Sequence, residues 1–103
     1  MDKIEKLLQF ISKNPADSFL QHALALEYVK MERDGEARKI FEEILTREPG
    51  YVGSYYHLGK LLERNNETEA AVKWYEQGME MAKQAGEAQA YGELRGAYES
   101  LTM

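Results

Sequence analysis

A spacing of 34 residues recurs in this chain and constrains its fold more than any other feature. Small and aromatic residues repeat at this distance, and so do the two prolines. The pairs are Pro15 and Pro49, Leu24 and Leu58, Ala25 and Gly59, Ala37 and Ala71, and Phe41 and Tyr75. Small residues are needed where two helices cross closely, and aromatic residues fill the layers between stacked helix pairs. We therefore expect two copies of one helix-turn-helix unit.

The rest of the sequence has the periodicity of helices. Apolar residues recur at helical spacing along nearly the whole chain, and no segment alternates with the period of two that is typical of strands. Proline, glycine and asparagine interrupt this pattern, and Asp34 and Thr68 are suitable N-caps for the helices that follow them. We expect six helices, at about residues 2–13, 17–33, 34–48, 51–65, 68–85 and 87–101.

A chain of 103 residues, 44% of them hydrophobic, has the size of one domain. Two such units are marginal alone, because each buries its apolar face only against a neighbour. We therefore expect a single domain with capping helices at both ends. Its expected parts are an N-terminal capping helix (1–15), a first repeat (16–51), a second repeat (52–85) and a C-terminal capping helix (86–103). Alternatively, one flanking helix is mobile and docks on a second molecule.

The residues at these positions resemble the tetratricopeptide repeat family, whose pattern is W-x2-L-G-x2-Y, then A-x3-F, then P. The matching residues are Leu24, Ala25, Tyr28, Ala37, Phe41 and Pro49 in the first copy, and Tyr55, Leu58, Gly59, Leu62, Ala71 and Tyr75 in the second. Gln21, Ile44 and Lys83 depart from the pattern. Because Lys83 replaces the terminal proline, we expect the helix from Thr68 to run longer.

The resemblance covers about residues 16–85 and implies an all-α fold of helix-turn-helix repeats. Such repeats stack as a short right-handed superhelix, an α-solenoid, here with about six helices. The chain is similar to small bacterial proteins of this family that have two repeats and flanking helices.

Composition excludes several classes of function. The chain has no cysteine, which removes disulfide frameworks, cysteine-ligated metal sites and thiol nucleophiles. A net charge of −5 argues against nucleic acid or an anionic membrane as the main partner. No apolar run reaches the ~18 residues of a membrane span, and the N-terminal residues lack the apolar segment of a signal peptide. We expect a cytoplasmic protein without a cofactor.

No pattern of catalytic residues is present. His22 and His57 lie 35 residues apart, at similar positions of the two repeats, but neither belongs to a metal-ligand motif. The segment 50–53 lacks the preceding strand and following lysine of a phosphate-binding loop. We expect no catalytic residue, no metal and no enzyme. An enzyme would require the two histidines to meet around a metal.

The first helix of each repeat is expected to line the concave side of the stack. Residues on these helices that face away from their own partner helix then form a groove. They are Phe19, His22, Leu26, Val29 and Lys30 in the first repeat, and Tyr56, Lys60, Glu63 and Arg64 in the second. The final helix adds Gln89 and Glu93. Alternatively, the N-terminal helix covers Phe19, Leu26 and Val29 and leaves no groove at that end.

Tyrosine and basic residues around apolar anchors are typical of protein interfaces. We therefore expect an adaptor that binds a peptide segment of another protein in the groove, most suitably an acidic or aromatic segment near Tyr56, Lys60 and Arg64. Some family members clamp a C-terminal carboxylate with lysine, asparagine and arginine. The corresponding residues here, His22, Leu26, Gly53 and His57, do not form that clamp. The alternative function is self-association, as a homodimer through an open repeat face or a terminal helix.

Overall fold

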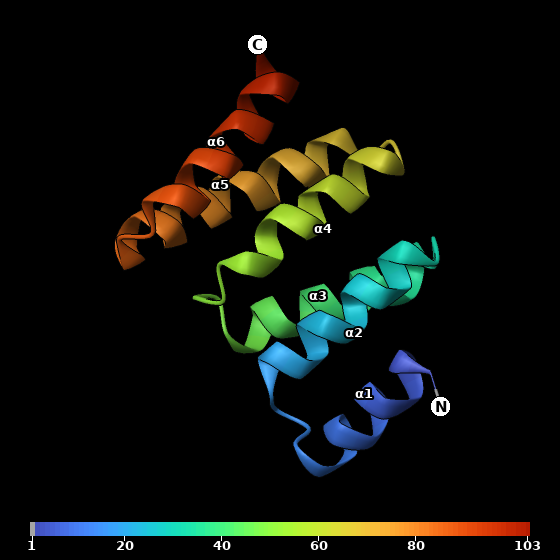
Figure 1. Ribbon diagram of the computed structural model, residues 1–103. Helices are drawn as coiled ribbons and strands as arrows, with labels where there is room; N and C mark the ends of the chain where they lie inside the picture. The colour runs from blue at the N-terminus through green and yellow to red at the C-terminus, as the bar shows by residue number, and fades with distance from the viewer. Residues whose placement is uncertain (1) are drawn as a thin grey trace. The chain divides into compact units, whose positions relative to one another are not determined.

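The computed structural model describes residues 2–103, and six α-helices account for most of them (Figure 1). In chain order these helices are α1 (Lys3–Lys13), α2 (Ser18–Lys30), α3 (Asp34–Arg47), α4 (Gly53–Arg64), α5 (Thr68–Ala85) and α6 (Ala88–Thr102). No strand occurs among residues 2–103, so the expected all-α class is confirmed. The chain divides into two compact units, one ending at Glu48 and the other spanning Pro49–Met103.

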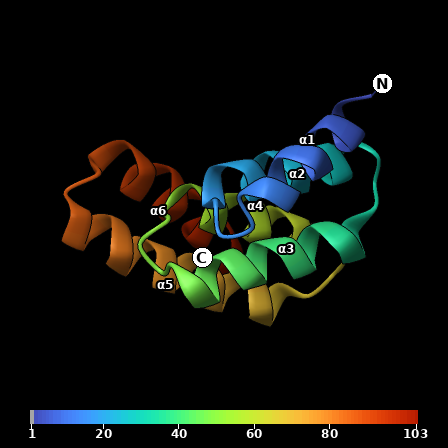
Figure 2. The ribbon, with the colours of Figure 1, turned by 90° about the horizontal axis from the view of Figure 1, so that it is seen from below.

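The first unit is built on the packing of α2 against α3 (Figures 1 and 2). Its buried side chains come from these two helices and include Leu24, Ala25, Ala37 and Phe41. Helix α1 packs on α2, yet none of its residues is fully buried. The two helices of the repeat therefore provide the core of this unit, and α1 is a peripheral addition.

In the second unit, α5 packs against both α4 and α6, and α4 also contacts α6. Two glycines allow these helices to cross closely. A Cβ atom on Gly59 would lie 2.1 Å from Cε1 of Tyr75, and one on Gly78 would lie 2.6 Å from Cβ of Tyr55. Both tyrosines are fully buried. The small residues that the sequence analysis assigned to helix crossings thus include Gly59, where only a glycine fits.

The turns between α2 and α3 and between α4 and α5 have the same backbone conformation. Glu32 has φ of 58° and Asn66 has φ of 63°, and these residues are 34 apart. In each turn, the amide of the next residue donates to a carbonyl five residues earlier, with N···O distances of 2.9 and 2.8 Å. This bond satisfies a carbonyl at the end of the preceding helix. The 34-residue repeat is therefore present in the backbone conformation of the turns as well as in the sequence.

Two expected N-caps are wrong. Arg33 and Glu67 are the N-caps of α3 and α5, and neither side chain makes a capping hydrogen bond to the helix backbone. Their carbonyls accept the first helical hydrogen bonds, and the tight turns begin each helix at the next residue. Asp34 and Thr68 therefore lie inside the first turn of their helices.

The other expected boundaries differ from the structure by a few residues at the helix ends. Helix α2 stops at Lys30, and α4 begins at Gly53 after a turn through Val52. Helix α5 is the longest, with 18 residues, which confirms the expected extension. It ends at Gly86, whose φ of 71° suits a residue without a Cβ atom. Within residues 2–103, none of the helices is long and apolar enough to span a bilayer.

Candidate functional site

The predicted binding residues of the first unit lie on α2. Phe19 is exposed over 70% of its surface, so α1 leaves this side chain accessible. Lys30 is also exposed, and its Nζ atom lies 3.1 Å from a carboxylate oxygen of Glu27. The remaining three, His22, Leu26 and Val29, are half-buried. The exposed aromatic residue at the start of α2 is therefore the most accessible apolar feature of this set.

His22 contributes to packing within the first unit. Its ring meets the ring of Phe41 on α3 edge-on, with 5.6 Å between the centroids. In the second unit, Tyr56 and Tyr75 form the equivalent contact 34 residues later, with a centroid distance of 6.5 Å. One side of His22 and one side of Tyr56 are thus held by the second helix of their own repeats.

The second unit has a denser arrangement around Tyr56. The Lys60 ammonium group lies 5.6 Å from the centre of the Tyr56 ring, and the His57 ring meets that ring edge-on at 5.8 Å. Lys60 also lies 3.6 Å from Glu63, which accepts a hydrogen bond from the Tyr75 hydroxyl. A cation, an anion and an aromatic ring therefore occur together on α4, within two turns of the helix.

Burial sets the protonation of two groups at this site. It raises the pKa of Tyr75 well above its ordinary range, and the Glu63 carboxylate raises it further. Tyr75 therefore remains a hydrogen-bond donor to Glu63 at neutral pH. Burial also lowers the pKa of His57 below its ordinary value of 6.5, while the negative charge of Glu93 acts in the opposite direction. His57 is consequently neutral at pH 7.

The predicted additions from α6 lie near this cluster. Glu93 interacts electrostatically with His57, so this part of α6 faces α4. Gln89 donates to Glu93 at 3.4 Å, and both side chains are exposed. Arg64 is exposed at the last residue of α4. We call Tyr56, His57, Lys60, Glu63 and Tyr75 the Tyr56 cluster.

Sequence reasoning missed two members of the Tyr56 cluster. His57 was considered as a metal ligand and as a position of a carboxylate clamp, and Tyr75 only as a packing residue. The signal for His57 was its position next to Tyr56 on the same helix. The predicted residues of α2 belong to one unit and those of α4 to the other, so their union in a single groove stays a prediction.

The chemistry of these surfaces is that of recognition. Within the part of the chain that the structure describes, no group of three histidine or acidic residues is placed to hold a metal ion. The Tyr56 cluster has an aromatic face for apolar contact and charges of both signs at its edge. Such a surface can order an extended or helical chain by combining apolar burial with oriented polar contacts.

Comparison with known proteins agrees with the repeat read from the sequence. The family model described as "Tetratricopeptide repeat" matches residues 20–51 and 52–84. A human relative, "Interferon-induced protein with tetratricopeptide repeats 2", is 32% identical over 81 residues. That alignment covers 75% of this chain but 17% of the human protein, so the chain corresponds to a small part of that relative.

Solved structures of similar fold include bacterial and yeast proteins. The tetratricopeptide repeat domain protein of Salinibacter ruber is 41% identical, with a TM-score of 0.80 over 84% of this chain and 97% of its own. A Bordetella parapertussis protein matches at 22% identity and a TM-score of 0.84, over 99% of this chain and 89% of its own. The TPR2B domain of yeast Sti1, solved in complex with pHsp70, has a TM-score of 0.88 at 14% identity, over 96% and 79% of the two chains.

Proposed function

Because this chain belongs to the tetratricopeptide repeat family, whose repeats are protein–protein interaction modules, we propose that it is a non-enzymatic adaptor. It binds a segment of a partner protein through the Tyr56 cluster of α4 and through the binding residues predicted on α2. We place this adaptor in the cytoplasm, where a chain without cysteine needs no oxidising environment.

The Tyr56 cluster is the observation that carries this proposal. Tyr56 is half-buried, and its contact with Tyr75 fixes its ring against α5. Lys60 lies beside the ring, and Glu63, which is opposite in charge, lies 3.6 Å from Lys60. A rigid aromatic ring with oriented polar neighbours loses little conformational entropy on binding, which is why tyrosine is common at interface centres.

The preferred partner segment carries an aromatic or acidic residue. An aromatic side chain would bury area against Tyr56, and a carboxylate would find Lys60 and Arg64 on the same helix. The yeast Sti1 domain shares only its fold with this chain, at 14% identity. The family's carboxylate clamp consists of lysine, asparagine and arginine. The corresponding positions here hold His22, Leu26, Gly53 and His57, which do not form it.

The test compares capture of partner proteins from a native lysate by wild type and by the Tyr56→Ala, Lys60→Glu variant. We expect the variant to lose the partner, because it removes the aromatic anchor and reverses the charge beside it. A short bound segment has micromolar affinity, about −8 kcal/mol, so losing ~2 kcal/mol at the anchor would abolish capture. Unchanged helicity, measured by circular dichroism, must accompany this loss.

Tyr28→Ala with Lys39→Glu is the matched control. It changes the same residue types in the first unit, at positions outside the predicted binding residues. Equal capture by wild type and the Tyr56 variant would contradict the binding site. Equal loss in the control would show that the effect is one of net charge or stability.

A further inference from the structure

The residue pattern of α4 recurs in α6 after 36 residues. The corresponding residues are Tyr55 and Tyr91, Leu58 and Leu94, and Leu62 and Tyr98. The middle leucine of each set is buried. In α4, the outer two residues are also buried, because α5 covers them. Their counterparts in α6, Tyr91 and Tyr98, are only half-buried. By this register, α6 resembles the first helix of a repeat, except that Arg95 stands where α4 has Gly59, and no further helix follows it within residues 2–103.

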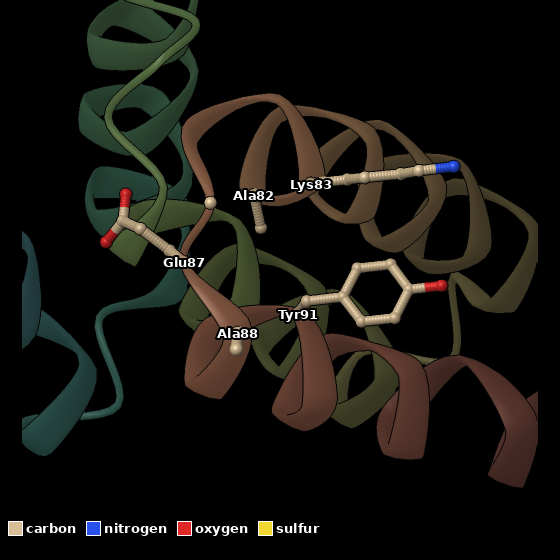
Figure 3. A pocket seen from close by; sticks show the side chains of 6 residues that line it. Ala82, Lys83, Glu87, Ala88 and Tyr91 are labelled. Atoms are coloured by element: carbon tan, nitrogen blue, oxygen red, sulfur yellow. The ribbon is translucent and has the colours of Figure 1, made fainter.

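The uncovered face of α6 forms a hollow with α5. A pocket of about 400 Å³ lies at the α5–α6 turn, where the ring of Tyr91 lies across from Ala82 and Lys83 (Figure 3). A second pocket, of about 240 Å³, continues from Tyr91 towards Met79 and Tyr98. We call this continuous surface the α5–α6 face. The first pocket is mainly apolar and the second is more polar, so the face suits a helix that presents both apolar and polar side chains.

Carboxylates predominate around this face, although Arg95 of α6 interacts with Tyr91. Glu76 and Glu80 of α5 line the second pocket, and Glu87 lines the first, against the single cation Lys83 among the residues lining the two pockets. All three glutamates are exposed. A helix that binds here gains most if it presents an apolar residue flanked by basic ones.

Helix α1 has this composition on its outer side. Phe10 is 55% exposed, and Lys3, Lys6 and Lys13 lie within about 60° of it around the helix, at ~100° per residue. No lysine of this set forms an ion pair within residues 2–103. We call these four residues the α1 face. Since α1 contains three lysines and one glutamate, it is the most positively charged helix of an otherwise acidic chain.

We propose that the α1 face of one copy docks on the α5–α6 face of a second copy. Phe10 enters the hollow beside Tyr91, and the lysines lie against Glu76, Glu80 and Glu87. The two surfaces differ, so the contact is heterologous and generates a ring or an open chain of copies. A second copy is the favoured occupant because the complementary charges and the exposed aromatic residue are both present in this chain. The contact leaves the Tyr56 cluster unused and is independent of peptide binding.

The first test is sedimentation velocity of the full chain over micromolar to millimolar concentrations. We expect the mean mass to rise with concentration at low ionic strength and the association to weaken at high ionic strength. A concentration-independent monomer mass would overturn the proposal. If that monomer floated with phosphatidylserine vesicles through its α1 lysines, the α1 face would belong to a membrane contact instead.

Charge exchange identifies the surfaces. In variant A, Lys3→Glu and Lys6→Glu reverse the α1 face; in variant B, Glu76→Lys and Glu80→Lys reverse the α5–α6 face. Each variant alone should dissociate, with a dissociation constant raised by about tenfold or more, because like charges then meet. An equimolar mixture of the two should associate again, since each acidic α1 then finds a basic partner face. Failure of the mixture to associate would overturn the proposed pairing.

Two controls separate this pairing from net charge. Lys39→Glu with Lys73→Glu matches variant A, and Glu43→Lys with Glu69→Lys matches variant B, all at exposed positions outside both faces. They should associate as wild type does, and equal loss in them would contradict the assignment. The Tyr56→Ala, Lys60→Glu variant should also associate normally, so failure of peptide binding and failure of self-association give distinguishable results.

Discussion

Gly59 is the residue at which the crossing of α4 and α5 depends most directly on side-chain size. Its missing Cβ would lie 2.1 Å from an atom of the Tyr75 ring, and that ring is fully buried and bonded to Glu63. The neighbour therefore has little room to move. By contrast, Gly92 and Gly96 on α6 are exposed, and nothing lies within 4 Å of a Cβ built on either.

Alanine substitution should have opposite effects at these glycines. Gly59→Ala should lower the free energy of unfolding by about 1–3 kcal/mol, because the core must shift to admit the methyl group. Gly96→Ala should raise it by about 0.5–1 kcal/mol, since alanine favours the helix and meets no obstacle. Urea denaturation of both variants and wild type measures the difference. A neutral or stabilising Gly59→Ala would contradict the close crossing.

The sequence predicted which residues pack in the core, but it did not predict the hydrogen bonds that their polar groups form. Ala25, Ala37 and Phe41 were assigned to the core by their 34-residue spacing, and all three are buried. The hydrogen bond from Tyr75 to Glu63 could not be predicted, because it depends on the side-chain conformations of residues on two helices. Spacing fixes which helix faces meet, whereas the rotamers that join their polar ends are set only after packing.

At the level of elements, the two turns have the same backbone conformation although different residues form them. Glu32 and Asn66 both adopt a left-handed backbone conformation, although only asparagine tolerates it well. The chain accepts this conformation at Glu32 because the turn connects α2 to α3 and satisfies a helix-end carbonyl.

Replacing Glu32 with glycine should therefore stabilise the protein. Relief of the left-handed strain is worth about 1–2 kcal/mol and exceeds the added flexibility of the unfolded chain, leaving a gain of about 0.5–1 kcal/mol. Asn66→Gly is the matched comparison and should change stability less, as asparagine already suits the conformation. Thermal unfolding measures both. A destabilising effect at Glu32 larger than that at Asn66 would refute this explanation.

Helix existence was predictable at this scale, but helix starts were less so. Apolar periodicity identified all six helices, because burial of one face dominates their stability. The predicted caps at Asp34 and Thr68 failed because the turn geometry, rather than a side-chain hydrogen bond, sets the first helical residue. Asp2, which was expected inside the first helix, is instead its N-cap and accepts a hydrogen bond from the Glu5 amide at 2.8 Å.

At the level of the whole molecule, stability should depend on pH through His57. Burial lowers its pKa in the folded state below the unfolded value of about 6.5, so the unfolded chain takes up the proton first on acidification. The contribution of His57 is complete above about pH 6.5 and is lost as the pH falls towards its folded pKa. We expect the free energy of unfolding to decrease over this interval, and His57→Gln to reduce the decrease.

The charge of Glu93 provides a second readout for this effect. It raises the pKa of His57 and thereby offsets part of the lowering caused by burial. Glu93→Gln should lower the pKa of His57 further and make the loss of stability on acidification steeper. Titration of the imidazole resonances by nuclear magnetic resonance measures the pKa directly. A folded-state pKa at or above 6.5 would contradict the role assigned to burial.

The candidate site could be predicted only in part, because helical periodicity predicts the residues on one helix face but not the arrangement of separate units. Helical phase placed Tyr56, Lys60 and Glu63 on one face, and the structure brings them into contact. Phase within one helix is local information, so the sequence carries it. A groove that also includes Phe19 and Leu26 depends on the arrangement of two units, which no periodicity within a helix encodes.

The matching turns at Glu32 and Asn66 also provide two structurally equivalent positions at which the chain can be joined. Residues 33–66 begin and end at joints with the same backbone conformation, so this segment can be duplicated in frame with matching ends. The duplicated length contains α3 and α4, taken from the two sides of the boundary at Glu48. The segment that can be duplicated, α3 with α4, therefore differs from the helix pairs that pack together, α2 with α3 and α4 with α5.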